Sequence, residues 1–501
     1  MMRIRKFASI FLIAVMVLTL FAEISNSETV KAEEPSFQSF QLVAVQWKWD
    51  VNDYASPTAF KNKLHSVMQD VVAQLDPNLP ALVCFPEFIG LPLLFVDGDV
   101  NLLQNASTFA DAIEALILRR WASVLAFMTW YGVGPVRALF LERSGAMQQA
   151  YLDAFKEVAA TYNVYIVGGS IAMREVDGSG NLIKDDNTCY NLSYFFGPDG
   201  KVLGWQKKVH LTPMEQYKDE KGNYGLDLNP GTLEELKVFS TPFGEVSIAI
   251  CYDAFFQDAI QTLAARGGGI LVQPSANPKE WDTWQQEDWL NGCWQATREP
   301  NGLNWFVNPM MVGPLKDITF EGQSSIGVNA SVGSGTQMNY MDLEPIEGFL
   351  AIAETKDQPE IVVQTITTDQ ARINYALNKP ATASGNQNSE LTPEKAVDGD
   401  FYSRWASRKQ DNEWWKVDLG SVVKVKGVTI WWERAYAKTY SIQVSTDDVN
   451  YTTVYSTTSG DGGVDAIWFE PVNARYIKVL GIQRVSSWYP FSFWEAKVYN
   501  N

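Results

Sequence analysis

The chain has 501 residues, which is too long for one ordinary domain and indicates two or three. With 46% hydrophobic and 20% charged residues it can build large cores, which excludes a disordered protein. A formal net charge of -18, without clustered lysine and arginine beyond the N-terminus, excludes a nucleic-acid-binding protein, and the presence of only two histidines excludes a three-histidine zinc site.

Residues 1–32 have the features of a secretory signal peptide. A positively charged start precedes an apolar run from about residue 7 to residue 21, and residues 30–32 offer a small-x-small cleavage site. The apolar run is short for a membrane span. We therefore expect a secreted, extracellular protein, with an uncleaved membrane anchor as the alternative.

Export would permit disulfide bonds among the four cysteines of the chain. Their irregular spacing does not show which of them pair, if any do. A nucleophilic role for one of them would leave at most one bridge. The four are Cys84, Cys189, Cys251 and Cys293.

The first domain opens with an apolar strand at residues 40–49 and a helix at residues 59–75. The next strand, ALVCFPE, ends at Glu87. An isolated buried charge is very costly, so we expect this carboxylate to have a partner at the mouth of the strand. A purely structural salt bridge is the alternative.

Residues 91–150 depart from this alternation of strands and helices and have helical patterns of their own. The apolar piece at 121–136 resembles a membrane segment, but it is short, is broken by glycine and proline, and lies between Arg120 and Arg137. We predict a helical insertion that forms a lid or an oligomer contact. Membrane contact is the alternative.

Residues 151–170 predict an amphipathic helix that runs into a strand, and residues 189–209 predict a hairpin that turns at Pro-Asp-Gly. The second strand of this hairpin delivers Lys207 and Lys208. Lysines at strand ends are usually solvated, and we expect this of Lys207. Lys208 begins the segment KVHLTPME, in which a second carboxylate, Glu215, lies seven residues further on.

A buried βαβ unit follows at residues 244–278. VSIAICY carries no charge on either face, AIQTLAAR has helical spacing, and ILVQPSA reads as a second buried strand. Cys251 therefore lies at the carboxyl end of a strand, just before a helix, where open α/β sheets bind ligands. The alternative is an ordinary buried cysteine.

Glu87 in CFPE, Lys208 in KVHLTPME and Cys251 in ICYD stand in this order at strand ends, and they resemble the carbon-nitrogen hydrolase (nitrilase) superfamily. The likeness runs over residues 38–370 and includes TPFG before the cysteine strand, LVQPSA after it and FEGQSSIG at 320–327. It implies an α/β fold, the αββα four-layer sandwich, assembled as a homo-oligomer.

Two departures from the family pattern affect the pocket. The insertion at 91–150 lies where members of the family often have a much shorter connection. Cys251 is also not followed by the Arg-Phe-Pro-Glu run that is common in the family. These departures leave open the mouth of the pocket and the wall beyond the cysteine, but not the nucleophile.

The resemblance implies a mechanism without a catalytic cofactor. Glu87 would take the thiol proton of Cys251, which attacks an amide or nitrile carbon to give a thioester. Lys208 and the backbone N–H of Tyr252 would stabilise the oxyanion, and Glu215 would orient the catalytic groups. A Cys251–His210 pair is the alternative, although we expect His210 to be a structural hydrogen bonder.

The composition changes after residue 373, and residues 374–501 predict short strands without helices, which is typical of an antiparallel β-sandwich. AVDGDFYSRWAS, WWKVDLG and ARYIKVL resemble the discoidin family (F5/8 type C), which has a jelly-roll fold. The resemblance implies a module that binds carbohydrate or a cell surface.

The loop AVDGDFYSRW has two interpretations. Asp-Gly is by default a tight turn, whereas the family resemblance implies a structural calcium ion with oxygen ligands. The ligands would be Asp398, Asp400, Ser403 and Glu495.

Aromatic residues of the second domain offer surface for stacking on sugar rings. Since neighbouring residues on a strand point to opposite faces, we expect one of Trp431 and Trp432 to be in the core. The candidate carbohydrate-binding residues are Trp432, Arg434, Tyr436, Arg408, Trp488 and Tyr489.

The sequence as a whole predicts a secreted hydrolase of a linear amide, with a signal peptide at 1–32, a catalytic domain at 38–370 and a glycan-targeting module at 374–501. A nitrilase and an N-acyltransferase with the same catalytic residues are alternatives within the enzymes. An adhesion or binding protein with a catalytically dead first domain is the alternative from another class.

Overall fold

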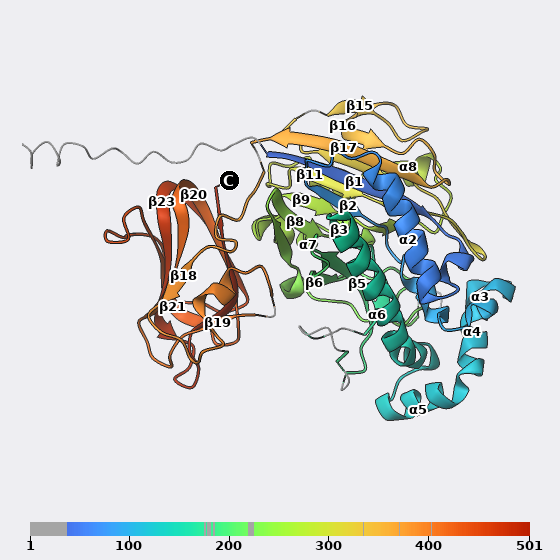
Figure 1. Ribbon diagram of the computed structural model, residues 1–501, viewed down its shortest axis with the longest axis horizontal. Coiled ribbons are helices and arrows are strands. Elements are labelled where there is room, and N and C mark those ends of the chain that lie inside the picture. Colours follow the sequence, from blue (N-terminus) through green and yellow to red (C-terminus); the bar gives the residue numbers. More distant parts are fainter. Residues whose placement is uncertain are drawn as a thin grey trace, which may run out of the picture.

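The computed structural model describes residues 38–500 apart from 175–176, 178–181, 184–185, 219–224, 334, 370 and 402. The predicted signal peptide at 1–32 lies outside the described residues. Figure 1 shows two domains side by side, a larger one with helices on its outer faces and a smaller one made of strands.

The first sheet of the larger domain has ten strands. They are β1 (Gln38–Lys48), β2 (Ala81–Cys84), β3 (Tyr165–Val167), β4 (Ile171–Met173), β5 (Tyr190–Phe196), β6 (Val202–Lys207), β10 (Ser275–Ala276), β12 (Met310–Leu315), β13 (Ile318–Phe320) and β17 (Glu360–Thr368). Its main path runs β10-β12-β1-β2-β3-β5-β4, and the predicted hairpin is the antiparallel pair β5–β6.

The second sheet has seven strands in the order β15-β16-β14-β11-β9-β8-β7. Their bounds are β7 (Val238–Thr241), β8 (Gly244–Ile248), β9 (Ile270–Val272), β11 (Trp305–Asn308), β14 (Ser325–Val328), β15 (Thr336–Met338) and β16 (Ile346–Ile352). Strands β8 and β9 are parallel and are joined by helix α7 (Gln257–Ala265), which confirms the predicted βαβ unit.

Helices cover the outer face of each sheet and complete a four-layer αββα sandwich. Helices α2 (Pro57–Val72) and α6 (Pro135–Tyr162) pack on the first sheet (Figure 1). Helix α7 packs on the second sheet, and α8 (Thr283–Trp289) and α9 (Cys293–Ala296) join the same core. Four short 3-10 turns, η1 (Val51–Tyr54), η2 (Leu91–Phe95), η3 (Leu233–Glu235) and η4 (Cys251–Phe255), complete the domain.

Strand β1 shows how the four layers are held together. Val43 and Val45 belong to the core under the helices, whereas Leu42 and Ala44 belong to the core between the two sheets. Successive side chains of a strand point to opposite faces, so a strand buried on both faces needs a continuous apolar run. This requirement accounts for the uninterrupted hydrophobicity of β1.

The segment predicted as a helical insertion, 91–150, contains η2, α3 (Val100–Asn105), α4 (Phe109–Arg119) and α5 (Trp121–Tyr131), and it ends inside α6. Figure 1 shows α3, α4 and α5 at one end of the domain. Among the described residues, no single helix is long and apolar enough to cross a membrane. The bent pair of α5 and α6 passes that test together, with an angle of 106° between the helices.

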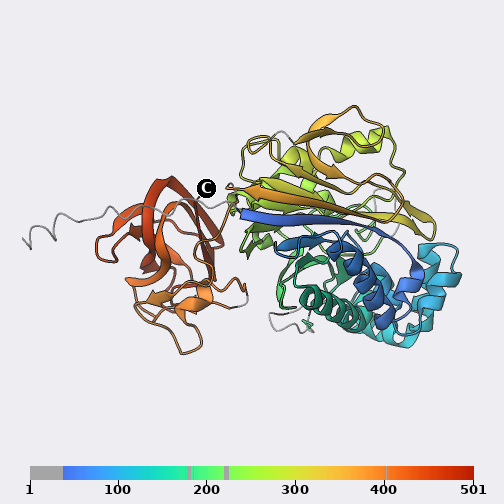
Figure 2. The same ribbon diagram turned by 45° about the horizontal axis from the view of Figure 1, so that its top comes forward.

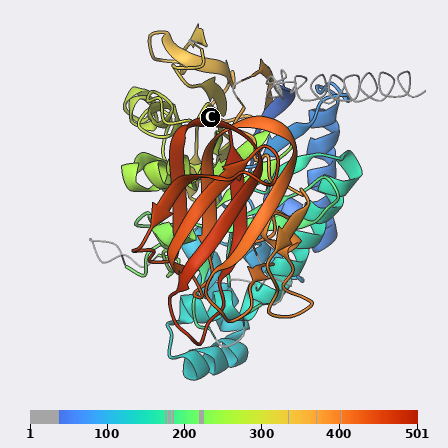
Figure 3. The ribbon, with the colours of Figure 1, turned by 90° about the vertical axis from the view of Figure 1, so that its left-hand side faces the viewer.

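The smaller domain is an antiparallel sandwich, which Figure 3 shows facing the viewer. Its strands are β18 (Ala381–Ala383), β19 (Trp405–Ala406), β20 (Glu413–Trp432), β21 (Ala437–Ser445), β22 (Thr452–Thr457), β23 (Val464–Arg484) and β24 (Ser492–Tyr499), with the 3-10 turn η5 at Pro393–Ala396. Trp415, Tyr440 and Phe493 lie in its core.

The two domains touch through strand β24, and Figure 2 shows the same side-by-side arrangement from another angle. The ammonium of Lys497 donates to the carboxylate of Glu245 at 2.7 Å and to the backbone carbonyl of Val238 at 2.6 Å. Lys497 and Glu245 are both fully buried. A buried ion pair needs its partner in place, so this contact fixes one domain against the other.

Candidate active site

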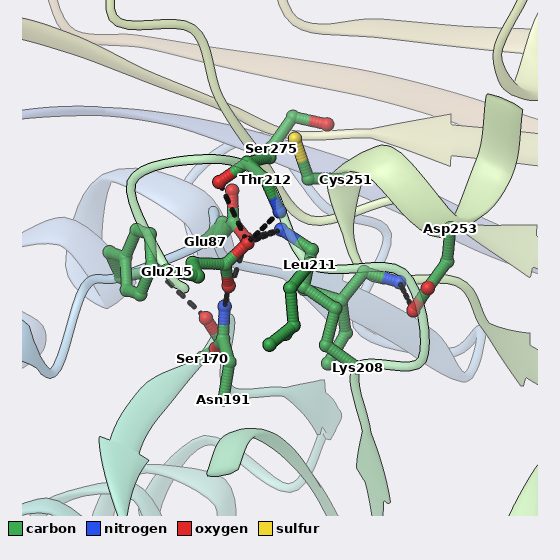
Figure 4. A network of polar contacts seen from close by, with 12 residues as sticks. Glu87, Ser170, Asn191, Lys208, Leu211, Thr212, Glu215, Cys251, Asp253 and Ser275 are labelled. Atoms are coloured by element: carbon green, nitrogen blue, oxygen red, sulfur yellow. Dashed lines mark hydrogen bonds and ion pairs between the residues drawn. The ribbon is translucent and has the colours of Figure 1, made fainter. Parts of the chain in front are cut away.

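Four side chains from separate parts of the first domain meet in one buried cluster (Figure 4). The ammonium of Lys208, just after β6, lies 2.7 Å from Oε1 of Glu87 and 2.6 Å from Oε2 of Glu215. The thiol of Cys251 is near enough to the Glu87 carboxylate to affect its pKa. The structure therefore brings together all four side chains that the sequence predicted to be catalytic.

Cys251 lies at a sharp turn between β8 and α7. Its φ angle is 46°, in the left-handed region that a residue with a side chain seldom adopts. The backbone N–H of Cys251 donates to the carbonyl of Pro274 at 2.9 Å, which holds the turn against the strand that follows α7. Strained conformations of this kind cluster at functional sites, where they aim a side chain.

Asn191 on β5 joins the two carboxylates and was not identified from the sequence. Its side-chain amide donates to Oε1 of Glu87 at 2.9 Å and to Oε1 of Glu215 at 2.7 Å. Its backbone carbonyl accepts from the N–H of Lys208 at 3.0 Å, so the hairpin delivers the amide and the ammonium together. The signal in the sequence was a polar amide inside the first strand of that hairpin, where Ser193 is a second polar residue.

The protonation equilibria of the cluster favour general-base chemistry. Burial raises the pKa of Glu87 to about 7, although the charge of Lys208 opposes that rise. Burial and the charge of Glu87 raise the pKa of the Cys251 thiol well above its usual value. Burial would lower the pKa of Lys208, but Glu215 and Glu87 more than compensate and raise it, so the ammonium stays charged.

His210 does not serve the thiol. Its Nδ1 lies 3.2 Å from Oδ1 of Asp253, its Nε2 lies 3.3 Å from Oδ2 of Asp258, and its ring stacks on Phe256 at 4.0 Å. The hydrogen bond to Asp253 raises the pKa of the imidazole, against the effect of burial. Both ring nitrogens are engaged by these carboxylates, as expected of a structural hydrogen bonder.

Asp253, two residues after the cysteine, is a second residue that the sequence did not reveal. Its carboxylate accepts the backbone N–H groups of Val209 and His210, at 3.0 and 2.7 Å. These bonds tie the turn that carries Cys251 to the strand end that carries Lys208 (Figure 4). Asp253 thereby positions the nucleophile against the ammonium.

Lys207 is not solvated, and that expectation was wrong. The side chain is nearly buried, its ammonium lies 2.5 Å from Oε1 of Glu235, and it sits over the ring of Tyr190. A partner 28 residues further along the chain is not visible in the local pattern.

The structure leaves all four cysteines as free, buried thiols. Burial raises the pKa of Cys189 to about 12 and also raises the pKa of Cys84 and Cys293. Burial has the same effect on the thiol of Cys251, so burial does not distinguish it from the other three. Cys251 differs from the other three in its contact with an acid and an ammonium.

The backbone position of Tyr252, directly after the nucleophile, agrees with the predicted oxyanion role, and its ring is partly exposed and packs edge-on against Phe256. The role itself stays a prediction.

Asp398, in the loop predicted to hold calcium, lies near enough to Glu495 to affect its pKa. The hydroxyl of Ser403 donates to Asp398 at 2.7 Å, and the backbone N–H of Asp400 donates to Asp398 at 3.0 Å. Burial, opposed by Lys497 and assisted by the charge of Asp398, raises the pKa of Glu495 well above its usual value.

Neither carboxylate oxygen of Glu495 has a hydrogen-bond partner of normal geometry. The backbone of Gly399 is close enough to the carboxylate to lower its pKa. Within the described residues, no group of three or more histidine, cysteine or acidic side chains is arranged to hold a metal. A calcium ion therefore fits only if backbone oxygens of the loop supply further ligands.

Trp432 is not available for carbohydrate, and that prediction was wrong. It is 5% exposed, its indole N–H donates to Asp465 at 2.7 Å, and its ring packs against Tyr440 and Phe493. Trp431 is also 5% exposed because its ring packs on Phe401 at the boundary with the first domain. The expectation that one of the two is in the core is confirmed, because Trp432 lies in the core of the second domain. Trp431 points into a different core, so both faces of this strand end are covered.

The other candidate carbohydrate-binding residues lie at or near the surface. Trp488 is 80% exposed and Tyr489 is 37% exposed, with the guanidinium of Arg434 over the Tyr489 ring at 5.7 Å. Tyr436 is half-buried, and Arg408 is exposed and paired with Glu413 at 2.8 Å. Trp488, Tyr489 and Arg434 form an aromatic and cationic face, which we call the Trp488 face.

Comparison with known protein families gives a match in each domain. Residues 67–298 match the model of the carbon-nitrogen hydrolases, and residues 395–479 match a model described as a NedA-like, galactose-binding F5/8 type C domain.

The chain is similar to omega-amidase NIT2 of Danio rerio, with 32% identity over 180 residues, which are 35% of this chain and 59% of that protein. It is also similar to the probable hydrolase YhcX of Bacillus subtilis, with 28% identity over 256 residues, which are 50% of this chain and 44% of that protein. The chain spans about half the length of the curated relatives it matches.

Solved structures similar to the chain include chitosan-binding module 1 of a chitosanase/glucanase from Paenibacillus sp. IK-5, 46% identical, covering 25% of this chain and 98% of that one with a TM-score of 0.25. Saccharomyces cerevisiae Nit3, of the nitrilase superfamily, is 17% identical and covers 67% of this chain and 92% of its own, with a TM-score of 0.40.

Proposed function

We propose that the first domain hydrolyses the carbon-nitrogen bond of a linear, non-peptide amide. Residues 67–298 match the carbon-nitrogen hydrolases, and an F5/8 type C domain follows them in the chain. The observation that carries this proposal is the buried cluster of one thiol, one ammonium and two carboxylates. Each group that acyl transfer requires, a nucleophile, a base that becomes an acid, and a positive charge, occurs in it once or more.

In the proposed acylation step, Glu87 takes the proton of the Cys251 thiol as the sulfur attacks the carbonyl carbon. A carbon-sulfur bond forms, and the carbonyl oxygen takes the electron pair as an oxyanion. Lys208 and the backbone N–H of Tyr252 stabilise that charge. The carbon-nitrogen bond then breaks, Glu87 returns its proton to the leaving amine, and a thioester remains.

In the proposed deacylation step, Glu87 takes a proton from water, and the hydroxide attacks the thioester carbon. A carbon-oxygen bond forms and the carbon-sulfur bond breaks. The carboxylic acid leaves, and Cys251 recovers its proton. Glu215 and Asn191 hold Glu87 and Lys208 in place through both steps, at the distances given above.

The test is the release of ammonia or amine from a panel of amides, nitriles and carbamoyl compounds by the full mature chain. Wild type is expected to hydrolyse at least one amide, and Cys251→Ala is expected to be inactive. Cys293→Ala is the matched control, because it removes a buried thiol on α9 outside the cluster. Equal activity of wild type and Cys251→Ala would overturn the proposal.

The same panel separates the other enzyme classes. A nitrilase would release ammonia from nitriles in preference to amides. An N-acyltransferase would convert the thioester to a new amide when an amine is added, without release of the free acid.

The second domain is proposed to bind carbohydrate through the Trp488 face. The family description supports this, and so do the exposed rings, because sugar rings stack on aromatic side chains. A glycan array that includes galactosides and chitooligosaccharides, probed with the full chain, is expected to give hits that Trp488→Ala weakens. No binding to any glycan would contradict the proposal.

A structural calcium ion is proposed in the loop of Asp398, with Glu495 as a second ligand. The support is the buried carboxylate of Glu495, whose pKa is raised by burial and by the charge of the partly exposed Asp398, because a divalent cation would favour the charged form of both. Calcium is expected to raise the melting temperature of wild type and to have no effect on Glu495→Gln. The same stabilisation of both proteins would contradict a site at Glu495.

Secretion and self-association are proposed from the N-terminal sequence and from the family. The mature chain is expected in the culture medium with its N-terminus near residue 33, which mass spectrometry would establish. Light scattering is expected to give a multiple of the monomer mass.

A further inference from the structure

The insertion closes one side of an apolar cavity in the first domain. The cavity has a volume of about 260 Å³, and helix α4 contributes Phe109, Ile113 and Ile117 to its wall. This volume is close to the lower end of the roughly 300–1,000 Å³ that is typical of small-molecule sites. The lining is mainly apolar and open to solvent on one side, which is the chemistry of a binding site for a hydrocarbon chain.

Two lining residues of the cavity lie close in the chain to the catalytic carboxylates. Leu91 lies in η2, four residues after Glu87, and Met214 directly precedes Glu215. The cavity therefore adjoins the two segments that carry the catalytic carboxylates.

The third wall leads to the nucleophile. Phe320 on β13 lines the cavity, β13 pairs with β12, and β12 pairs with β10. Strand β10 contains Ala276, whose backbone interacts with the Cys251 thiol. The cavity is thus connected to the reaction centre through the segments that follow Glu87 and precede Glu215 and through the paired strands β13, β12 and β10, and α4 supplies a further wall.

The solvent side of the cavity carries negative charge. Glu114 and Asp317 are exposed members of its lining, and Asp317 accepts the backbone N–H of Phe109 at 2.8 Å, at the N-terminus of α4. A chain that ends in a carboxylate would meet like charge there, whereas an uncharged chain would not.

We propose that this cavity receives an uncharged apolar chain of the amide substrate, so that the enzyme favours amides with a hydrocarbon chain over short or anionic ones. The proposal rests on the proposed amide hydrolysis. It gives the insertion a specific role, which is to select the substrate. The chain belongs either to the acyl group or to the leaving amine, and the experiment distinguishes the two.

The experiment measures kcat/KM of the full mature chain for two series. One runs from acetamide through butyramide and hexanamide to octanamide, and the other carries the same chains on nitrogen, as N-alkyl acetamides. In one of the series, kcat/KM is expected to rise about threefold to fourfold per methylene until the cavity is full. Adipamic acid, with a terminal carboxylate, is expected to be poorer than hexanamide.

Two variants of one residue make the test specific. Ile113→Trp fills the cavity and is expected to remove most of the rise with chain length, whereas Ile113→Ala enlarges it and is expected to move the optimum to a longer chain. Leu118→Trp is the matched control, because Leu118 lies on the same helix but is 72% exposed. Its chain-length profile is expected to match wild type.

The outcomes separate this inference from the proposed function. Activity that depends on Cys251 but is independent of chain length, or that keeps its profile in both Ile113 variants, would overturn the inference alone. If no amide is hydrolysed, calorimetric titration of Cys251→Ala with octanamide and acetamide decides. Tighter binding of octanamide that Ile113→Trp abolishes supports the cavity assignment, and no binding overturns it.

Discussion

Lys208 and Lys497 are both fully buried, and each lies 2.7 Å from a glutamate, yet their surroundings differ. The neighbours of Lys208 are titratable groups, a second carboxylate and a thiol. Lys497 also has a second carboxylate near it, Glu495, but its other contacts are a backbone carbonyl and the rings of Phe401 and Trp431. A buried ion pair alone is therefore no sign of catalysis.

The difference lies in what the ion pair controls. At Lys208 the pair sets the charge of an acid next to a nucleophile, with the pKa of Glu87 raised to about 7 by burial. At Lys497 the pair joins β24 to the second sheet of the first domain. Removal of the Lys208 ammonium should therefore lower the catalytic rate, whereas removal of the Lys497 ammonium should lower the stability of the fold.

Lys497→Met gives the largest expected effect on stability. It leaves the Glu245 carboxylate buried without the ammonium that pairs with it. The free energy of unfolding, measured by urea denaturation, should fall by about 3–5 kcal/mol. The double variant Lys497→Met/Glu245→Gln removes the stranded charge and should recover most of the loss. A loss of kcat in Lys497→Met under conditions where it stays folded would break the comparison.

Lys208→Met gives the largest expected effect on activity. Loss of the positive charge at the oxyanion should lower kcat by about 10²–10³-fold on the best amide of the panel, as for other oxyanion donors. Circular dichroism would establish that the variant is folded. A wild-type kcat in a folded Lys208→Met protein would contradict the role of the ammonium.

The pH dependence of kcat/KM sharpens the comparison. Glu87 must be ionised to accept the thiol proton, and burial raises its pKa to about 7, so kcat/KM should fall as the pH drops below about 7. Lys497→Met should leave this acid limb in place. A limb near pH 4.5, the ordinary pKa of a glutamate, would contradict the raised pKa of Glu87.

Asn191→Ala tests the hydrogen bond that favours the charged form of Glu87. Its removal should raise the pKa of Glu87 and shift the acid limb of kcat/KM upward by about one unit. Asn191→Asp adds a like charge and should shift the limb further in the same direction. A limb that stays in place in both variants would indicate a merely structural role.

Trp488→Ala is expected to have the smallest effect. The loss of one exposed stacking ring should weaken glycan binding by about twofold to tenfold, without any change in amide hydrolysis. Trp130→Ala is the matched control, because Trp130 is 83% exposed on α5 of the other domain. Equal weakening by both variants would argue against a site on the Trp488 face.

Buried strands leave clear patterns, which predicted the α/β class and placed Glu87 and Cys251 at strand ends. The αββα fold and the roles of Lys208 and Glu215 were predicted from the resemblance to the carbon-nitrogen hydrolases. Asn191 and Asp253 were missed because their roles depend on which strand ends meet in space. Trp432 was misassigned because we assumed that one face of its strand meets solvent.

The central claim is that Cys251 carries the acyl group of an amide. Intact-protein mass spectrometry after rapid acid quenching, followed by peptide mapping, tests it most directly. Wild type mixed with the best amide should gain the mass of one acyl group, located on the peptide that contains Cys251, and Cys251→Ala should gain none. Turnover without such an adduct, or an adduct at another residue, would contradict the account.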